Sequence, residues 1–181
     1  MKNIILGITG SISAYKAADI ANGLVKSGYN VNAVMTASAA GFITPLTIQS
    51  LTKRRVYTNV LQEDDPSIIA HIDLAKSADA LLIAPATANI IGKIAHGIAD
   101  DMLTSCVLAV QGVPRIIAPA MNCRMYENDA VQDNLRILKE RSWQIIEPRS
   151  GRLACGDTGK GALAGVEEIL TFVKKAIGEN I

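Results

Sequence analysis

Short apolar runs that alternate with helical stretches constrain the fold of this chain more than any other feature. Residues 3–8 (NIILGI) are continuously apolar, which is typical of a strand buried on both faces of a parallel sheet. We expect further strands at residues 29–36, 56–61, 80–84, 114–119 and 142–147. Because strands and helices alternate through most of the chain, the sequence predicts one domain over residues 1–181. It is an α/β domain with a doubly wound, Rossmann-like or flavodoxin-like parallel sheet and helices on both faces.

Helical patterns fill the intervals between these strands. Thr44-Pro45 is a good helix start, since threonine caps well and proline suits the first helical position. The expected helices cover residues 14–26, 44–51, 71–79, 90–99, 100–110, 127–141 and 165–177, with a kink at Gly97. The glycine-rich segment 152–162 is expected to be a mobile loop.

The composition excludes several classes of protein. A formal net charge of +1 gives no electrostatic reason to expect nucleic acid or a membrane as a partner. The chain has no run of about 18 apolar residues to span a membrane, and its apolar start is too short for a signal peptide. Three cysteines and two histidines lack metal-ligand spacing, so we expect no metal and a reduced, cytoplasmic compartment.

The turn after the first strand has the geometry of a phosphate site. A strand, a glycine turn and a helix direct backbone N–H groups toward an anion, and Ser11 and Ser13 add hydroxyl donors beside Gly10. A plain turn with serine as the helix cap is the alternative. The motif G-x-G-x-x-G is absent, and Thr36-Ala37-Ser38 ends the second strand where an acidic residue would hold a ribose. A mononucleotide or flavin phosphate is therefore favoured over NAD.

Polar residues also follow two later strands. Segments 85–89 (PATAN) and 119–126 (PAMNCRMY) stand at strand ends, where open α/β sheets bind ligands. His71 begins a short helix, where an imidazole can serve as acid or base, although a lone histidine is more often a capping or surface group.

Cys155 lies in the glycine-rich segment near the C-terminus. It is either a thiol on a flap or an incidental cysteine of a surface loop. A Walker phosphate loop is rejected for this segment, because Ala154 and Gly161 stand where that motif needs glycine and serine or threonine.

The combination of His71, PATAN at 85–89, PAMNCRMY at 119–126 and ACGDTGKG at 154–161 resembles the homo-oligomeric flavin-containing cysteine decarboxylases, over nearly the whole chain. The resemblance implies FMN as the cofactor and a trimer or dodecamer with active sites at subunit boundaries. The residues it implies for FMN binding are Gly10, Ser11, Ile12, Ser13, Thr36, Ser38, Thr87, Ala88, Asn89, Ile90 and Ala120.

The same resemblance implies roles in catalysis. His71 would be the active-site base or an orienting group, Asn122 would hold the substrate carboxylate, and Cys155 would donate the last proton. The further residues implied to contact the substrate are Met125, Arg152 and Ala154.

Members closest to this pattern act on 4′-phosphopantothenoylcysteine in coenzyme A biosynthesis, and the resemblance implies that activity. FMN would oxidise the CH2–SH group to a thioaldehyde, whose C=S accepts the electrons as CO2 leaves. Reduction of the resulting enethiol would give 4′-phosphopantetheine, so the reaction is redox neutral and needs no NAD(P)H. The ligase domain that many bacterial relatives carry would be a separate protein.

Three alternative functions differ from this one in features that the sequence would show. A decarboxylase of a C-terminal cysteine in a lantibiotic peptide should lack the ACGD segment in this form. A flavin prenyltransferase should lack the combination of His71, Asn122 and Cys155, all of which this chain has. A non-catalytic regulatory subunit with this fold should have lost one of the three or carry long acidic tails.

Overall fold

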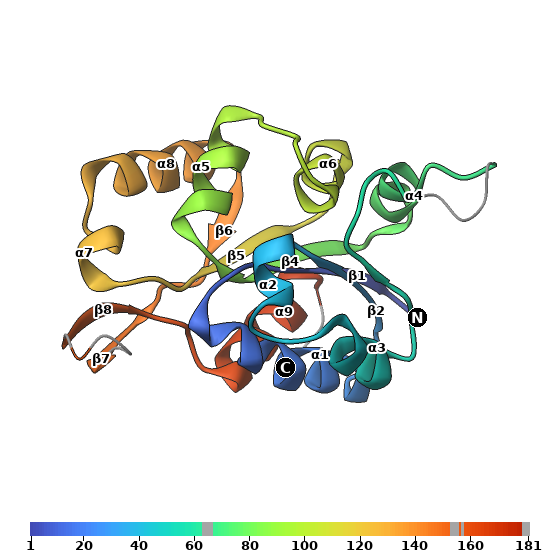
Figure 1. Ribbon diagram of the computed structural model, residues 1–181, viewed down its shortest axis with the longest axis horizontal. Coiled ribbons are helices and arrows are strands. Elements are labelled where there is room, and N and C mark those ends of the chain that lie inside the picture. Colours follow the sequence, from blue (N-terminus) through green and yellow to red (C-terminus); the bar gives the residue numbers. More distant parts are fainter. Residues whose placement is uncertain (63–66, 153–155, 157, 179–181) are drawn as a thin grey trace.

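The computed structural model describes residues 1–62, 67–152, 156 and 158–178, with Arg152 described by its main chain alone. Its centre is a parallel sheet with the strand order β3-β2-β1-β4-β5-β6 (Figure 1). The strands are β1 (Asn3–Ile8), β2 (Asn30–Met35), β3 (Val56–Tyr57), β4 (Ala80–Ala86), β5 (Arg115–Pro119) and β6 (Trp143–Ile145). The chain winds outward in both directions from β1 and β4, which confirms the predicted doubly wound fold.

Helices cover both faces of this sheet, which explains why its strands are continuously apolar. Ile4 and Leu6 of β1 pack into one buried cluster and Ile5 into the other. Below the sheet in Figure 1 lie α1 (Lys16–Lys26), α3 (Pro45–Thr52) and α9 (Val166–Ala176). Above it lie α4 (Ala70–Ser77), α5 (Ala88–His96), α6 (Met102–Ala109) and α8 (Asp129–Glu140).

Several expected helices are divided more finely in the structure. The first begins with a 3-10 turn, η1 (Ile12–Tyr15), before α1, and a short helix α2 (Ala37–Ala40) follows β2. Instead of a kink at Gly97, the chain leaves α5 there, because glycine readily adopts the left-handed φ of 69° that ends the helix. The helix expected from residue 127 is α8, which is capped by Asn128 and preceded by α7 (Cys123–Tyr126). The strand expected at 56–61 is only the two residues of β3.

The prediction of a loop over residues 152–162 was wrong for its described part. β7 (Arg149–Arg152) and β8 (Thr158–Ala162) pair as an antiparallel hairpin. The glycines of β8 allow close packing: a Cβ on Gly159 would lie 2.7 Å from Cys123 Cβ, and one on Gly161 would lie 2.3 Å from the carbonyl oxygen of Met121. Leu153, Ala154, Cys155 and Asp157 lie outside the described residues.

Within the described part of the chain, no helix is both long and apolar enough to cross a membrane.

Candidate active site

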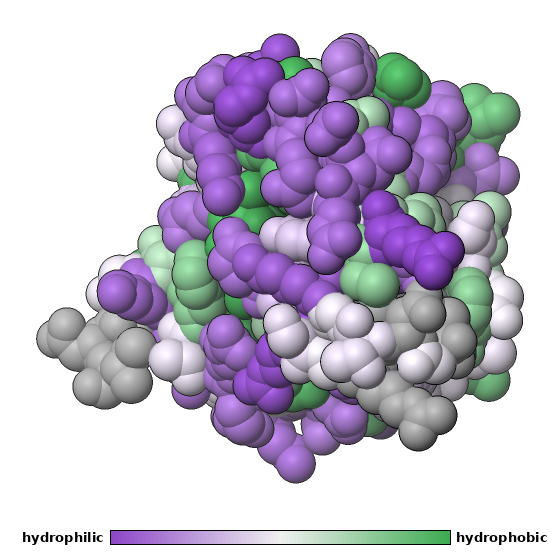
Figure 2. All heavy atoms as spheres, turned by 90° about the vertical axis from the view of Figure 1, so that its left-hand side faces the viewer, coloured by the Kyte–Doolittle hydropathy of each residue, from purple (hydrophilic) through white to green (hydrophobic). Residues whose placement is uncertain are grey.

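A cavity of about 890 Å³ opens where the parallel strands end. The segments that follow β1, β2, β4 and β5 line it, together with the end of β8. Figure 2 looks onto this side of the molecule and shows apolar surface framed by hydrophilic side chains. Since β1 and β4 are the neighbours at which the winding reverses, the cavity lies where doubly wound sheets bind their ligands.

The structure brings together most of the residues expected at the site. The predicted residues that line this one cavity are Gly10, Ser11, Ile12, Ser13, Thr36, Ser38, Thr87, Ala88, Asn89, Ile90, Ala120, Asn122 and Met125. His71 is not among its lining residues, whereas the side chain of Arg152, together with Ala154 and Cys155, lies outside the described part of the chain.

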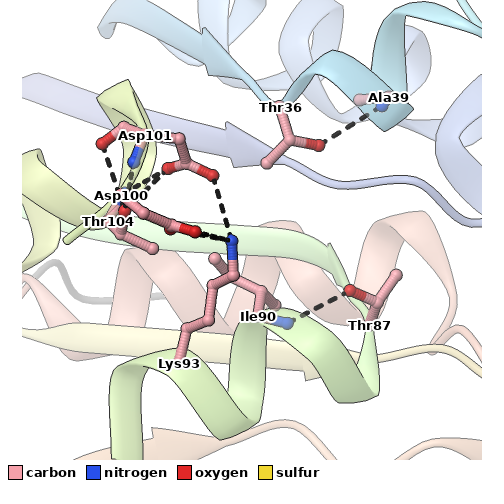
Figure 3. A network of polar contacts seen from close by, with 8 residues as sticks. All are labelled: Thr36, Ala39, Thr87, Ile90, Lys93, Asp100, Asp101 and Thr104. Carbon is pink, nitrogen blue, oxygen red and sulfur yellow. Dashed lines mark hydrogen bonds and ion pairs between the residues drawn. The ribbon is translucent and has the colours of Figure 1, made fainter. Parts of the chain in front are cut away.

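Hydroxyl groups at the cavity cap the helical turns that begin there. Each hydroxyl oxygen accepts a hydrogen bond from a backbone N–H two or three residues later. The acceptor and donor pairs are Ser11 and Ser13 (3.2 Å), Thr36 and Ala39 (3.3 Å), and Thr87 and Ile90 (3.3 Å), and Figure 3 shows the last two. The serine-cap alternative is therefore correct for Ser11, but it does not compete with ligand binding. A hydroxyl that accepts a backbone bond can still donate its own hydrogen.

A buried threonine joins the ends of the two central strands. The Thr9 hydroxyl donates to the carbonyl oxygen of Pro85 at 2.7 Å and accepts from the backbone N–H of Thr87 at 3.1 Å. Thr9 is only 1% exposed, so these bonds are shielded from water. The turns after β1 and β4 are thereby held together as one wall of the cavity.

The wall around Gly10 fits an anionic group. A Cβ at Gly10 would lie 2.4 Å from Ser38 Cβ, so the backbone after β1 packs directly on the first turn of α2. Backbone and hydroxyl donors from these two turns face one region of the cavity, as a phosphate requires. Small and apolar residues farther along the wall, Ala88, Ile90 and Ala120, leave room for a planar ring.

Charged side chains in the cavity were missed by the sequence analysis. Lys93 lines it and donates to both carboxylate oxygens of Asp100, at 2.7 and 2.8 Å (Figure 3). This bond holds the pKa of Asp100 below its usual value. Asp101, also in the lining, lies 3.9 Å from Lys93 and caps α6 through the backbone N–H of Thr104 at 2.8 Å. One ammonium group therefore faces two carboxylates, so Lys93 contributes no unpaired positive charge to the cavity.

Lys16 is a second cation of the cavity lining. Its Nζ lies 5.9 Å from the centre of the Tyr15 ring, and no carboxylate in the described part of the chain forms an ion pair with it. Lys16 therefore adds a positive charge to a cavity that already offers backbone and hydroxyl hydrogen-bond donors to an anion. It stands three residues after Ser13, one helical turn along the chain, and this spacing could have revealed it.

Asn122 lies between the sheet and the hairpin. Its Oδ1 accepts the backbone N–H of Arg124 at 2.8 Å and so caps α7, which makes the amide nitrogen the donor end of the side chain. The preceding residue, Met121, donates its backbone N–H to the carbonyl oxygen of Gly161 at 3.0 Å. The segment around Asn122 is thus bound to β8, and both line the cavity.

His71 occupies a different part of the molecule. It lies in the first turn of α4, and two other residues of that helix, Ala70 and Asp73, border a separate hollow of about 640 Å³ near the amino end of β1. The Nδ1 atom of His71 is buried and has no hydrogen-bond partner among the described residues. An unpartnered buried polar atom is costly, so this nitrogen is a candidate for a contact that the described residues do not supply.

The two cysteines in the described part of the chain are packing residues. Cys106 is fully buried in α6, and burial raises the pKa of its thiol to about 12. Cys123 is buried at the start of α7. Both are free thiols, and the described residues contain no cluster of three or more potential metal ligands.

The fold and cavity define a doubly wound α/β protein with a ligand cavity at the carboxyl ends of its strands, and comparison with known proteins gives its family. The Flavoprotein family model matches residues 1–178, and the chain belongs to this family. A protein of Streptococcus mutans described as a probable phosphopantothenoylcysteine decarboxylase is 50% identical over 177 residues, which cover 97% of this chain and 99% of that protein. A bifunctional coenzyme A biosynthesis protein of Bacillus subtilis is 47% identical over 99% of this chain, which spans only 44% of that protein.

Solved structures agree with this assignment. A cysteine-to-serine mutant of a PPC decarboxylase, complexed with pantothenoylaminoethenethiol, matches with a TM-score of 0.85 and 32% identity, over 96% of this chain and 97% of that one. The FMN-dependent cysteine decarboxylase SpaF matches with a TM-score of 0.83 and 32% identity, over 98% of this chain and 95% of that one.

Proposed function

We propose that this chain is a single-domain, FMN-dependent decarboxylase that converts 4′-phosphopantothenoylcysteine to 4′-phosphopantetheine and CO2 in coenzyme A biosynthesis. The observation that carries the proposal is the cavity in which the turns after β1, β2 and β4 meet Asn122. The identity to the Streptococcus mutans protein over nearly its full length supports the substrate. The printed descriptions of the PPC decarboxylase and SpaF structures support the chemistry.

Gly10, Ser11 and Ser38 would hold the phosphate of FMN through their backbone and hydroxyl donors, and the small and apolar residues Ala88, Ile90 and Ala120 would leave room for its ring. When bound, it supplies the reversible two-electron oxidation that turns the substrate's CH2–SH group into an electron acceptor. The protein's own task is to hold the substrate beside that ring and to move protons.

Asn122 holds the substrate carboxylate through its amide nitrogen until the bond to the α-carbon breaks and CO2 leaves. Met125, which lines the cavity, packs against the substrate, and Arg152 and Ala154 are the further residues assigned to substrate contact. Cys155 delivers the proton that completes the product. The Lys16 ammonium attracts the phosphate of a ligand in the cavity.

The active enzyme is a homo-oligomer, a trimer or dodecamer, in which a second copy completes the site. Support comes from His71, which is proposed as the base or orienting group and yet does not line the cavity of its own chain. The unpartnered Nδ1 of His71 is consistent with a role at a boundary between copies. The free thiols of Cys106 and Cys123 agree with a cytoplasmic enzyme.

The first test is made on the purified wild-type protein. It is expected to be yellow with bound FMN and to release CO2 from 4′-phosphopantothenoylcysteine, giving a product lighter by one CO2 in mass spectrometry. A cysteine-ending peptide serves as the competing substrate, and preferential turnover of the peptide would reassign the enzyme. A colourless protein that rebinds no FMN would contradict the proposal altogether.

A second test separates the chemical steps. Cys155→Ser is expected to release CO2 in a single turnover and then stop with the oxidised enethiol bound, because serine is too weak an acid to replace the thiol. Stopped-flow absorbance of the flavin and product mass spectrometry follow the two steps. Normal multiple turnover by this variant would remove Cys155 from the mechanism.

A further inference from the structure

Glu147 connects two parts of the molecule that the proposed function leaves unexplained. It follows β6 and lies between α7 and the hairpin strand β8. Its Oε2 accepts a hydrogen bond from the Tyr126 hydroxyl at 3.0 Å and another from Lys160 Nζ at 2.8 Å. Lys160 also lies over the Tyr126 ring, 5.6 Å from its centre. One carboxylate oxygen therefore joins the end of α7 to the middle of β8.

Both partners of Glu147 belong to elements that line the cavity. Tyr126 is 7% exposed, and its backbone N–H donates to the carbonyl oxygen of Asn122 at 2.9 Å, so its position is coupled to the residue that caps α7. Lys160 stands next to Gly161, which accepts the backbone N–H of Met121 and lines the cavity. The contacts of Glu147 thus connect the same two segments as the hydrogen bond from Met121 N–H to the Gly161 carbonyl, which holds the Asn122 segment against β8.

The charges needed for this link persist at neutral pH. The hydrogen bond from Lys160 lowers the pKa of Glu147 against the opposing effect of its partial burial, so the carboxylate stays ionised. Burial raises the pKa of Tyr126 to about 12, with the Glu147 charge as the next cause, so the hydroxyl keeps its proton and remains a donor. Among the described residues, Lys139 of α8 also forms an ion pair with this carboxylate, 3.5 Å from Oε1.

We propose that Glu147 is a positioning residue, which clamps β8 to α7 through Lys160 and Tyr126 and so holds Asn122 at the substrate carboxylate. The inference rests on the proposed decarboxylase function. It assigns Glu147 no contact with the substrate. Loss of the clamp therefore lowers the rate of the chemical step more than it weakens substrate binding.

The test compares variants that remove one charge each. Glu147→Gln and Lys160→Gln are expected to lower kcat about three- to fivefold, with KM nearly unchanged, since a half-exposed ion pair has a coupling of this size. Lys160→Arg keeps the charge and is expected to retain the wild-type kcat. Lys139→Gln removes the other cation at the same carboxylate, but from a helix outside the hairpin, and is expected to change neither constant.

Hydrogen exchange provides a readout independent of turnover. In Glu147→Gln and Lys160→Gln, the backbone amide of Met121, which bonds to Gly161, is expected to exchange about three- to fivefold faster than in wild type and in Lys139→Gln. Wild-type kcat and wild-type exchange in both glutamine variants would overturn the inference, as would equal losses in Lys139→Gln. If the wild-type protein itself released no CO2, the proposed function would fail, while the exchange measurement would still decide whether the clamp exists.

Discussion

Gly10→Ala is expected to weaken FMN binding severely and, at limiting FMN, to lower CO2 release with it. The added methyl group would lie 2.4 Å from Ser38 Cβ and 3.1 Å from the Ser38 carbonyl carbon. Because part of this contact is backbone, a side-chain rotation cannot relieve it. The turn after β1 and the first turn of α2 must move apart, and both line the cavity. We expect the Kd for FMN to rise at least about 100-fold, which is roughly 2.7 kcal/mol of binding free energy.

Gly41→Ala is the matched control for this variant. Gly41 also lies beside Ser38, but its added methyl group would be 3.5 Å from the Ser38 carbonyl oxygen, an ordinary contact, and its φ of −74° suits any residue. Flavin fluorescence titration measures the FMN affinity of both variants. Overpacking of this kind destabilises a fold by roughly 1–3 kcal/mol, so far-UV circular dichroism is used to test whether Gly10→Ala is folded. Wild-type FMN affinity in folded Gly10→Ala would show that the cofactor binds elsewhere.

The sheet and most of the cavity could be predicted for a single physical reason. A strand that is covered on both faces must be apolar along its whole length, as Ile4, Ile5 and Leu6 are. Once such runs are ordered along the chain, their carboxyl ends meet at one edge of the sheet. Polar residues directly after a run, such as Ser11, Thr36 and Thr87, then have to lie together.

The hairpin could not be predicted because a glycine-rich sequence is compatible both with a mobile loop and with close packing of one strand against another segment. Gly159 and Gly161 were interpreted as a sign of mobility, whereas in the structure they admit close packing against the segment 121–123. The difference depends on a contact between residues almost 40 positions apart. The paired charges of Lys93 and Asp101 were missed for a similar reason, because the turn after α5 brings them to the cavity from two different helices.

Gly161→Ala is expected to reduce CO2 release at least about 100-fold, since displacement of a catalytic group by about 1 Å can cost that much. The added methyl group would lie 2.3 Å from the Met121 carbonyl oxygen and 3.3 Å from the Cys123 backbone nitrogen. Both atoms belong to the main chain on either side of Asn122, so the contact can be relieved only by separating β8 from that segment. The bond from Met121 N–H to the Gly161 carbonyl, 3.0 Å long, would be lost with it.

Gly151→Ala tests whether this loss reflects the contact with the Asn122 segment or a general effect of alanine in the hairpin. Gly151 pairs with Gly159 across the hairpin and needs no left-handed φ, and no atom of the described residues lies within 4 Å of its added methyl group. It is therefore expected to keep wild-type activity. CO2 release is measured for both variants at saturating FMN, beside thermal unfolding, since overpacking destabilises a fold by about 1–3 kcal/mol. Equal activities in folded Gly161→Ala and Gly151→Ala would mean that β8 does not position Asn122, because only the first substitution forces them apart.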